Sequence, residues 1–252
     1  MTNIFFKNTF RVLEIVYIRL ILWPKLKSNF FNKRGLEVGG PSKIFMKFGI
    51  MPIYSASLQV DVCNFSSQTV WEGALEEGFN FDPDGVTIGR QIICDGSNMP
   101  MLQNESCDFI LSCHNLEHFA NPLKAIAEWL RILKSGGILL LVLPDPTKTF
   151  DRTRKITSFN HLKEDYIKNT SEDDFTHIDE IIRDTDLSIF PLEPGETIID
   201  FIELCNSNSK NRCAHHHVFD FQLLDEIFNY FKISKVVEFK SKPFHLVIIG
   251  KK

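Results

Sequence analysis

The sequence lacks the patterns of secreted, membrane-spanning and nucleic-acid-binding proteins. Its six cysteines include no C-x-x-C pair, which favours reduced thiols over a disulfide framework or a zinc site. The first apolar run, residues 4–23, has no small-residue cleavage site and is interrupted by Arg11, Glu14 and Arg19, which argues against a signal peptide or a membrane span. The formal net charge is -4, so no general basic field favours nucleic acid. These absences predict a cytoplasmic protein without a nucleic-acid partner.

The composition is that of a folded chain long enough for one α/β domain with insertions. Its 252 residues are 44% hydrophobic, which is enough to fill a core. Short apolar runs alternate with helix-like stretches, and this alternation is typical of a doubly wound α/β sheet. We expect strands at residues 36–38, 57–62, 91–94, 109–113, 138–143, 235–240 and 244–249, and helices at 43–48, 116–133 and 221–231, the last capped by Asp220.

A glycine turn ends the first of these strands. Glu37 lies inside the strand, and the run from Gly39 to Ser42, Gly-Gly-Pro-Ser, follows it directly. Such a turn brings backbone N–H groups against a ligand at the start of a nucleotide-binding unit, although it also occurs as a plain turn. Asp61 follows Gly39 by 22 positions, the distance at which an acid accepts hydrogen bonds from ribose hydroxyls. The alternative is an ordinary strand Asp.

Several short motifs occur in a fixed order along the chain. The most specific are Leu-Glu-His at 116–118 and Arg-Ile-Leu-Lys-Ser-Gly-Gly at 131–137, which follow Leu-Glu-Val-Gly-Gly at 36–40, Asp61 and Cys-Asp-Gly at 94–96. In this order they resemble the class I S-adenosylmethionine-dependent methyltransferases, and their type-11 branch above all. The resemblance covers residues 34–144 well, and the part from residue 220 onward by topology only.

The resemblance implies a cofactor, S-adenosylmethionine, and a mostly parallel, Rossmann-like sheet of seven strands that ends in an antiparallel hairpin. The glycine turn departs from the family's usual Gly-x-Gly-x-Gly pattern. By position, the implied cofactor-binding residues are Glu37, Gly39 and Gly40 at the methionine end, Asp61 at the ribose, Asp95 and Gly96 at the adenine edge, and Ser112 and His114 near the sulfonium.

A long polar insertion, residues 144–219, follows the fifth strand. It holds five of the eight histidines, and it is placed to form a lid or acceptor pocket, because ligands of open α/β sheets lie outside the carboxyl ends of the strands. Adjacent histidines on an extended stretch point in alternate directions. The run 215–217 is open to three interpretations: a hydrogen-bonded loop, a general base, or a metal ligand together with Asp173, Asp174 or His177.

Methyl transfer to a hydroxyl requires a base, because an unperturbed hydroxyl is a poor nucleophile. Asp151 and Arg152, just past the fifth strand, are either a pair that holds a polar acceptor or a surface pair. We expect no bound metal. The catalytic candidates are His215, His216, His114 and Asp151.

The N-terminal segment, residues 1–33, is expected to lie outside the domain formed by residues 34–252. An apolar helix is predicted over residues 4–23, with Lys7, Arg11 and Glu14 on one face and Pro24 at its end. The first 34 residues carry seven basic residues and one acid. Three partners are open for this helix: its own domain, a second subunit of a homodimer, or an anionic membrane surface.

The predicted function is methyl transfer from S-adenosylmethionine to a polar, hydroxyl-bearing acceptor, with a sugar or glycan of polysaccharide biosynthesis as the leading class. Two alternatives stay open: a membrane-associated lipid or quinone-like acceptor, and a non-catalytic binding module on the same fold. The expected location is the cytoplasm, and the N-terminal helix adds peripheral contact with the inner face of a membrane as an alternative.

Overall fold

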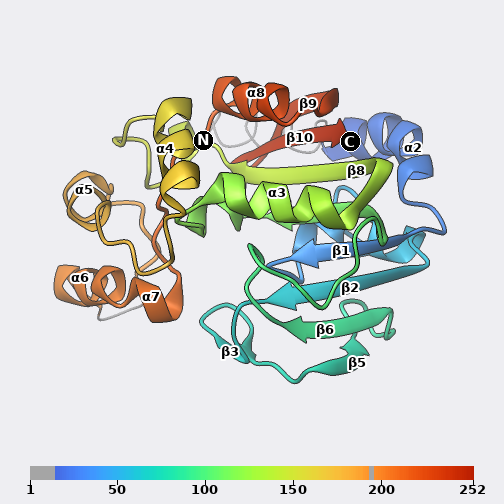
Figure 1. Ribbon diagram of the computed structural model, residues 1–252, viewed down its shortest axis with the longest axis horizontal. Coiled ribbons are helices and arrows are strands. Elements are labelled where there is room, and N and C mark those ends of the chain that lie inside the picture. The colour runs from blue at the N-terminus through green and yellow to red at the C-terminus, as the bar shows by residue number, and fades with distance from the viewer. Residues whose placement is uncertain (1–14, 193–195) are drawn as a thin grey trace, which may run out of the picture.

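The computed structural model describes residues 15–192 and 196–252 (Figure 1). Its centre is an eight-stranded sheet in the order β5-β6-β2-β1-β7-β8-β10-β9. The strands from β6 to β8 run parallel, whereas β5, β10 and β9 pair antiparallel with their neighbours. The strands are β1 (Arg34–Val38), β2 (Gln59–Asn64), β5 (Gly78–Phe81), β6 (Gly89–Ile93), β7 (Cys107–Cys113), β8 (Leu133–Pro144), β9 (Ser234–Ser241) and β10 (His245–Lys251), with a separate hairpin of β3 (Gln68–Thr69) and β4 (Gly73–Ala74).

The helices fall into three groups. Two of them, α3 (Pro122–Ile132) and α8 (Phe221–Tyr230), contribute to the core on the same face of the sheet. Asp220 caps α8 as expected, because its side chain accepts a hydrogen bond from the Leu223 backbone N–H at 2.8 Å. The N-terminal group ends in α2 (Trp23–Leu26), and the insertion contains α4 (Phe159–Lys168), α5 (Ile178–Asp184), α6 (Ile198–Asn206) and α7 (Asn208–Asn211).

Alternate residues of the central strands belong to two different cores. On β7, Ile110 packs in the core beneath α3 and α8, while Phe109 and Leu111 pack in the core on the opposite face. The strand β8 alternates in the same way along its apolar run. Both faces of the parallel sheet are therefore covered, which confirms the predicted doubly wound α/β class.

Two local predictions are wrong in detail. The sheet has eight strands rather than seven, because β5 pairs antiparallel with β6 at the edge. The helix expected over residues 43–48 is a single 3₁₀ turn, Lys43–Phe45, after which the chain is extended at Met46. The backbone then turns instead of continuing a helix, because the Gly49 N–H donates a 2.8 Å hydrogen bond to the Met46 carbonyl.

The described part of the N-terminal segment packs on the domain itself. Ile18, Trp23 and Leu26 are buried in the core opposite α3, and Arg19 donates hydrogen bonds to the carbonyl groups of residues 47 and 48. Pro24 does not end the helix, because a proline in the first turn of α2 needs no N–H partner. The predicted positions of Lys7, Arg11 and Glu14 lie outside the described residues.

The same segment also exposes apolar side chains. Val16, Tyr17, Leu20 and Ile21 are each more than two-fifths exposed. Within residues 15–192 and 196–252, no helix combines the length and apolar character needed to cross a membrane. The membrane-surface contact and the homodimer stay predictions.

The insertion gathers beyond the carboxyl ends of the parallel strands. In Figure 1 the arrowheads of β1, β2 and β6 point toward the side where α5, α6 and α7 lie. The helices α5 and α6 share a small core of their own, which includes Ile178, Ile181, Phe201 and Cys205. The helix α4 packs against α3 and α8, so it joins the insertion to the main domain.

Candidate active site

A large cavity opens where the parallel strands end. Its volume is about 1310 Å³, and its walls come from the turn after β1, the ends of β2 and β7, the β3–β4 hairpin and the insertion. Ligand pockets for a single small molecule usually measure roughly 300–1,000 Å³. The cavity therefore has room for two ligands side by side, as a transfer reaction requires.

The glycine turn forms one wall of this cavity. Gly39 has a φ of 81°, and a Cβ placed on it would lie 2.5 Å from Asn115 Oδ1, so only glycine fits. Gly40 does not line the cavity; its own Cβ would fall 2.2 Å from the Glu37 carboxylate behind the turn. The turn is fixed to β2 by Asn64, whose Nδ2 donates a 2.9 Å hydrogen bond to the Gly40 carbonyl.

Glu37 supports the turn from behind. Its side chain is fully buried and accepts a hydrogen bond from the Tyr54 hydroxyl, which in turn accepts one from the Ser42 backbone N–H at 2.8 Å. Burial raises the pKa of Glu37 to about 7. Since Glu37 is not part of the cavity wall, the expected direct contact with the methionine end is not supported by its position.

Asp61 lies away from the cavity. It is in the middle of β2, opposite Leu36, and its Oδ1 accepts hydrogen bonds from Gln59 Nε2 and from the Arg90 backbone. The predicted ribose contact is therefore not supported. The strand continues to Asn64, which is buried and lines the cavity, and which the sequence analysis did not identify. A polar residue at the true carboxyl end of the strand is the signal that could have found it.

The end of β6 meets the insertion. Asp95 has both carboxylate oxygens engaged: Oδ1 accepts from Ser97, and Oδ2 lies 2.5 Å from Arg212 Nη2. Burial alone would raise the pKa of Asp95, but Arg212 and the hydrogen bonds from Ser97 together outweigh burial and hold this pKa below its usual range. Gly96 lines the cavity as expected, and its carbonyl accepts a hydrogen bond from Trp129 Nε1 at 2.8 Å. The adenine contact of Asp95 stays a prediction.

The end of β7 places His114 in the cavity wall. His114 adopts a φ of 47°, and its Nε2 lies 2.7 Å from His245 Nδ1. Burial lowers the pKa of His114 to about 3, so the ring is neutral and is a weak base. Ser112, two residues earlier, is buried behind the wall, and its hydroxyl has no hydrogen-bond partner.

On the insertion side, His215 lines the cavity and is held by two charged residues. His215 Nδ1 lies 2.6 Å from Asp151 Oδ2, while Arg154 Nη1 donates to Asp151 Oδ1 at 2.9 Å and to the His215 carbonyl at 2.7 Å. Burial opposes the charged imidazole, but the carboxylates of Asp151 and Glu117 together outweigh burial and raise the pKa of His215. This arrangement fixes one tautomer and leaves Nε2 for an acceptor.

The other sequence candidates on this side lie elsewhere. His216 points away from the cavity, with its Nε2 2.7 Å from Asn208 Nδ2, so its predicted catalytic role is not supported. Asp151 lies behind His215 and is absent from the wall of the large cavity. Arg152 pairs with Asp186 rather than with Asp151. The expected Asp151–Arg152 grip is therefore replaced by the Asp151–Arg154 pair.

Unpartnered polar atoms mark the region between the two walls. Glu117 lines the cavity with both carboxylate oxygens buried and without a hydrogen-bond partner, and burial raises its pKa to about 7. Asn115 Nδ2 is also buried and unpartnered. A cation with a carboxylate of its own satisfies both groups, because an anionic oxygen pairs with a cation and an amide N–H donates to a carboxylate. These residues, with the tight Gly39 turn, fit S-adenosylmethionine.

The comparison with protein families agrees with this geometry. Residues 55–141 match the family model described as "Methyltransferase domain" (Methyltransf_11). The match covers 87 of the 252 residues, and this part of the chain is similar to a methyltransferase domain. The match extends from just before β2 into β8 and begins after the glycine turn. It confirms the resemblance to S-adenosylmethionine-dependent methyltransferases and S-adenosylmethionine as the cofactor.

Several solved structures are similar to this chain at low sequence identity. A SAM-dependent methyltransferase from Aquifex aeolicus is 11% identical at a TM-score of 0.47, with 94% of this chain and 92% of that chain covered. A SAM-dependent methyltransferase from Methanosarcina mazei is 17% identical at a TM-score of 0.46, with 89% of this chain and 95% of that chain covered. The N-methyltransferase NodS from Bradyrhizobium japonicum WM9 is 11% identical at a TM-score of 0.47, with 97% of this chain and 96% of that chain covered. No curated protein sequence matches the chain.

Proposed function

We propose that this methyltransferase methylates a hydroxyl group of a sugar or glycan, with His215 as the general base. The observation that carries the proposal is the Asp151–His215 pair, with 2.6 Å between Asp151 Oδ2 and His215 Nδ1, in the cavity wall formed by the insertion. Because Nδ1 faces Asp151, Nε2 is the ring nitrogen that can take a proton from an acceptor. A sugar hydroxyl needs such a base, whereas an acidic quinol needs it less.

S-adenosylmethionine supplies an electrophilic methyl group and its own leaving group. The protein has to bind the cofactor and the acceptor, align the acceptor oxygen with the methyl group, and exclude water from the site. Gly39 and Asn115 hold the cofactor side, and the insertion covers the acceptor side. His215 Nε2 would take the proton of the acceptor hydroxyl, and bound S-adenosylmethionine would supply the methyl group that replaces this proton on the acceptor oxygen. Asp151 keeps the imidazole in one tautomer and stabilises its charged form.

The test compares His215→Gln with His216→Gln as the matched control. Purified proteins are assayed for methyl transfer to a panel of sugars, glycans, lipids and quinols, and cofactor affinity is measured by calorimetry. We expect His215→Gln to lower kcat about 10²–10⁴-fold with unchanged cofactor affinity, and His216→Gln to keep most of the turnover. Methylation of lipids or quinols but of no sugar or glycan would contradict the proposed sugar acceptor. Cofactor binding without turnover on any acceptor would favour the non-catalytic module.

A further inference from the structure

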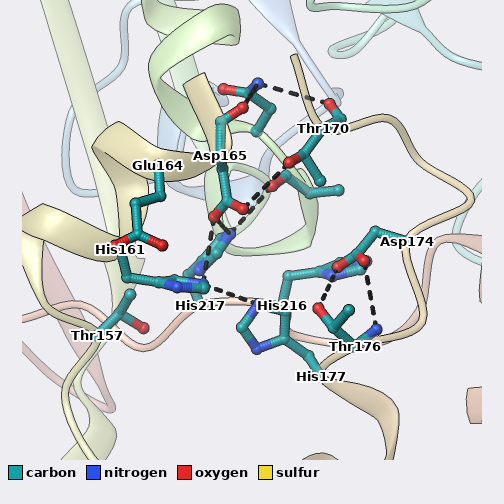
Figure 2. A network of polar contacts seen from close by, with 12 residues as sticks. Thr157, His161, Glu164, Asp165, Thr170, Asp174, Thr176, His177, His216 and His217 are labelled. Carbon is teal, nitrogen blue, oxygen red and sulfur yellow. Dashed lines mark hydrogen bonds and ion pairs between the residues drawn. The ribbon is translucent and has the colours of Figure 1, made fainter. Parts of the chain in front are cut away.

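A second cluster of histidines lies in the insertion, apart from the cavity. Its members are His161 and Asp165 on α4, His177 at the start of α5, and His217 on the segment before α8 (Figure 2). Each side chain offers one ligand atom, and these atoms all lie within 4.8 Å of one another. None of the four residues lines the large cavity. The cofactor and the acceptor therefore do not explain this convergence.

The distances in the cluster are close to those of a metal site. His161 Nε2 lies 2.9 Å from His177 Nε2 and 3.2 Å from Asp165 Oδ2, and Asp165 Oδ2 lies 3.9 Å from His217 Nε2. Ligand atoms at about 2.0–2.1 Å from a tetrahedral zinc ion are about 3.3 Å apart. All four ligand atoms lie within 4.8 Å of one another, so changes of at most about 1.5 Å in any one separation bring them to this tetrahedral spacing.

The surroundings prepare Asp165 as a ligand. Its Oδ1 accepts a hydrogen bond from Thr170 Oγ1 at 3.1 Å, and its backbone carbonyl accepts one from Asn121 Nδ2 at 2.8 Å. Its Oδ2 is buried, points to the histidines and accepts no hydrogen bond. A carboxylate oriented through one oxygen, with the other left free, is typical of a metal ligand.

We propose that His161, Asp165, His177 and His217 bind one zinc ion. Three imidazoles and a carboxylate suit Zn²⁺, and four protein ligands form a closed, structural site rather than a catalytic one. Without metal, one of the two facing nitrogens of His161 and His177 must carry a proton, and to bind the ion that ring takes the tautomer with its proton on Nδ1 instead. His217 Nε2 gives up its 3.3 Å contact with the Ala120 carbonyl and coordinates the ion instead.

The ion would join three segments of the insertion that are distant in the sequence. It would tie α4, which packs against α3 and α8, to the start of α5 and to the segment that carries His215. His217 follows His215 by two residues, so the site would also hold the acceptor wall of the cavity. This consequence rests on the proposed function, whereas metal binding itself does not.

The first measurement is metal binding by the full-length chain. Protein stripped with EDTA is titrated with Zn²⁺ against a chromophoric chelator, and Co²⁺ is added separately to record the visible absorption of a tetrahedral site. We expect one Zn²⁺ per chain and a higher thermal midpoint when it is bound. A stripped protein that takes up no Zn²⁺, or takes it up without a change in the thermal midpoint, overturns the proposal.

Variants place the ion at the cluster. Asp165→Asn removes the anionic ligand, and Glu164→Gln removes the neighbouring exposed carboxylate of the same helix as a matched control. We expect Zn²⁺ affinity to fall more than about 100-fold in Asp165→Asn and to stay unchanged in Glu164→Gln. If Asp165→Asn does not fold, the Zn²⁺ affinity of His161→Gln is the test of the site. The His161 side chain is 35% exposed, so its replacement should be tolerated. Equal affinity in ligand variant and control refutes the site.

Discussion

The two walls of the cavity are held in different ways. The wall at the strand ends uses the backbone of the glycine turn and the amide side chains of Asn64 and Asn115. The wall from the insertion uses charged side chains, with Asp151, Arg154 and His215 in one buried group. The first wall suits a cofactor shared by a whole family, and the second suits an acceptor specific to this chain. Changes to the two walls should therefore have separable effects.

The largest separable effect is expected from Asp151→Asn. The amide neither holds the His215 tautomer as firmly nor stabilises its charged form, so we expect kcat to fall about 100-fold or more while cofactor affinity stays unchanged. Turnover and calorimetric titration with S-adenosylmethionine measure the two effects. Asp173→Asn is the control, because that exposed carboxylate accepts a hydrogen bond from Ser171 in its own loop and does not line the cavity. Equal losses of turnover and cofactor affinity would show that the walls are not independent.

Gly39→Ala tests the opposite wall. A side chain at a φ of 81° costs roughly 1–2 kcal/mol, and its Cβ would also collide with Asn115. We expect cofactor affinity to fall about 10–100-fold, given that 1.4 kcal/mol corresponds to tenfold. Gly85→Ala is the control, because Gly85 has a similar φ of 79° but nothing within 4 Å of its Cβ. Comparable cofactor affinity in the two variants would contradict the role of the glycine turn.

The sequence predicts the first wall better than the second. Apolar runs bounded by glycine and polar residues are local signals, so the strands and their doubly wound order could be expected. The exact end of β2 could not, because Asn64 joins the strand by pairing with Ile93 across the sheet. Asp61 was chosen by its spacing, but it lies inside the strand and contacts Gln59 and Arg90.

The second wall depends on contacts across the insertion. Asp151 and His215 are 64 residues apart, and no periodic pattern links them. The sequence identified both residues, but it paired Asp151 with Arg152, its neighbour in the chain. The turn after β8 instead brings Arg154 onto Asp151, and Arg152 onto Asp186. Three consecutive histidines were visible in the sequence, but their three different surroundings require the folded insertion.

A smaller effect distinguishes Asn64 from Asp61. Asn64→Ala removes the hydrogen bond to the Gly40 carbonyl and a polar group of the cavity wall, so we expect cofactor affinity to fall about tenfold, the effect of one hydrogen bond of about 1.4 kcal/mol. Asp61→Ala should leave cofactor affinity unchanged, because its side chain lies away from the cavity. Calorimetry on both variants gives the answer. Loss of cofactor affinity in Asp61→Ala alone would support the ribose contact that the spacing from Gly39 predicted for Asp61.

The smallest effect is a shift in the pH dependence of turnover. His215 must be neutral to accept a proton, and Asp151 raises its pKa above the ordinary histidine value against the opposing effects of burial and Arg154. Activity should therefore rise with pH through a midpoint above that value. In Asp151→Asn the carboxylate is gone and burial dominates, so the midpoint of the residual activity should move to lower pH. Glu117 also faces this imidazole and raises its pKa, so Glu117→Gln should move the midpoint in the same direction by a smaller amount. A midpoint that stays in place in both variants would show that another group supplies the base.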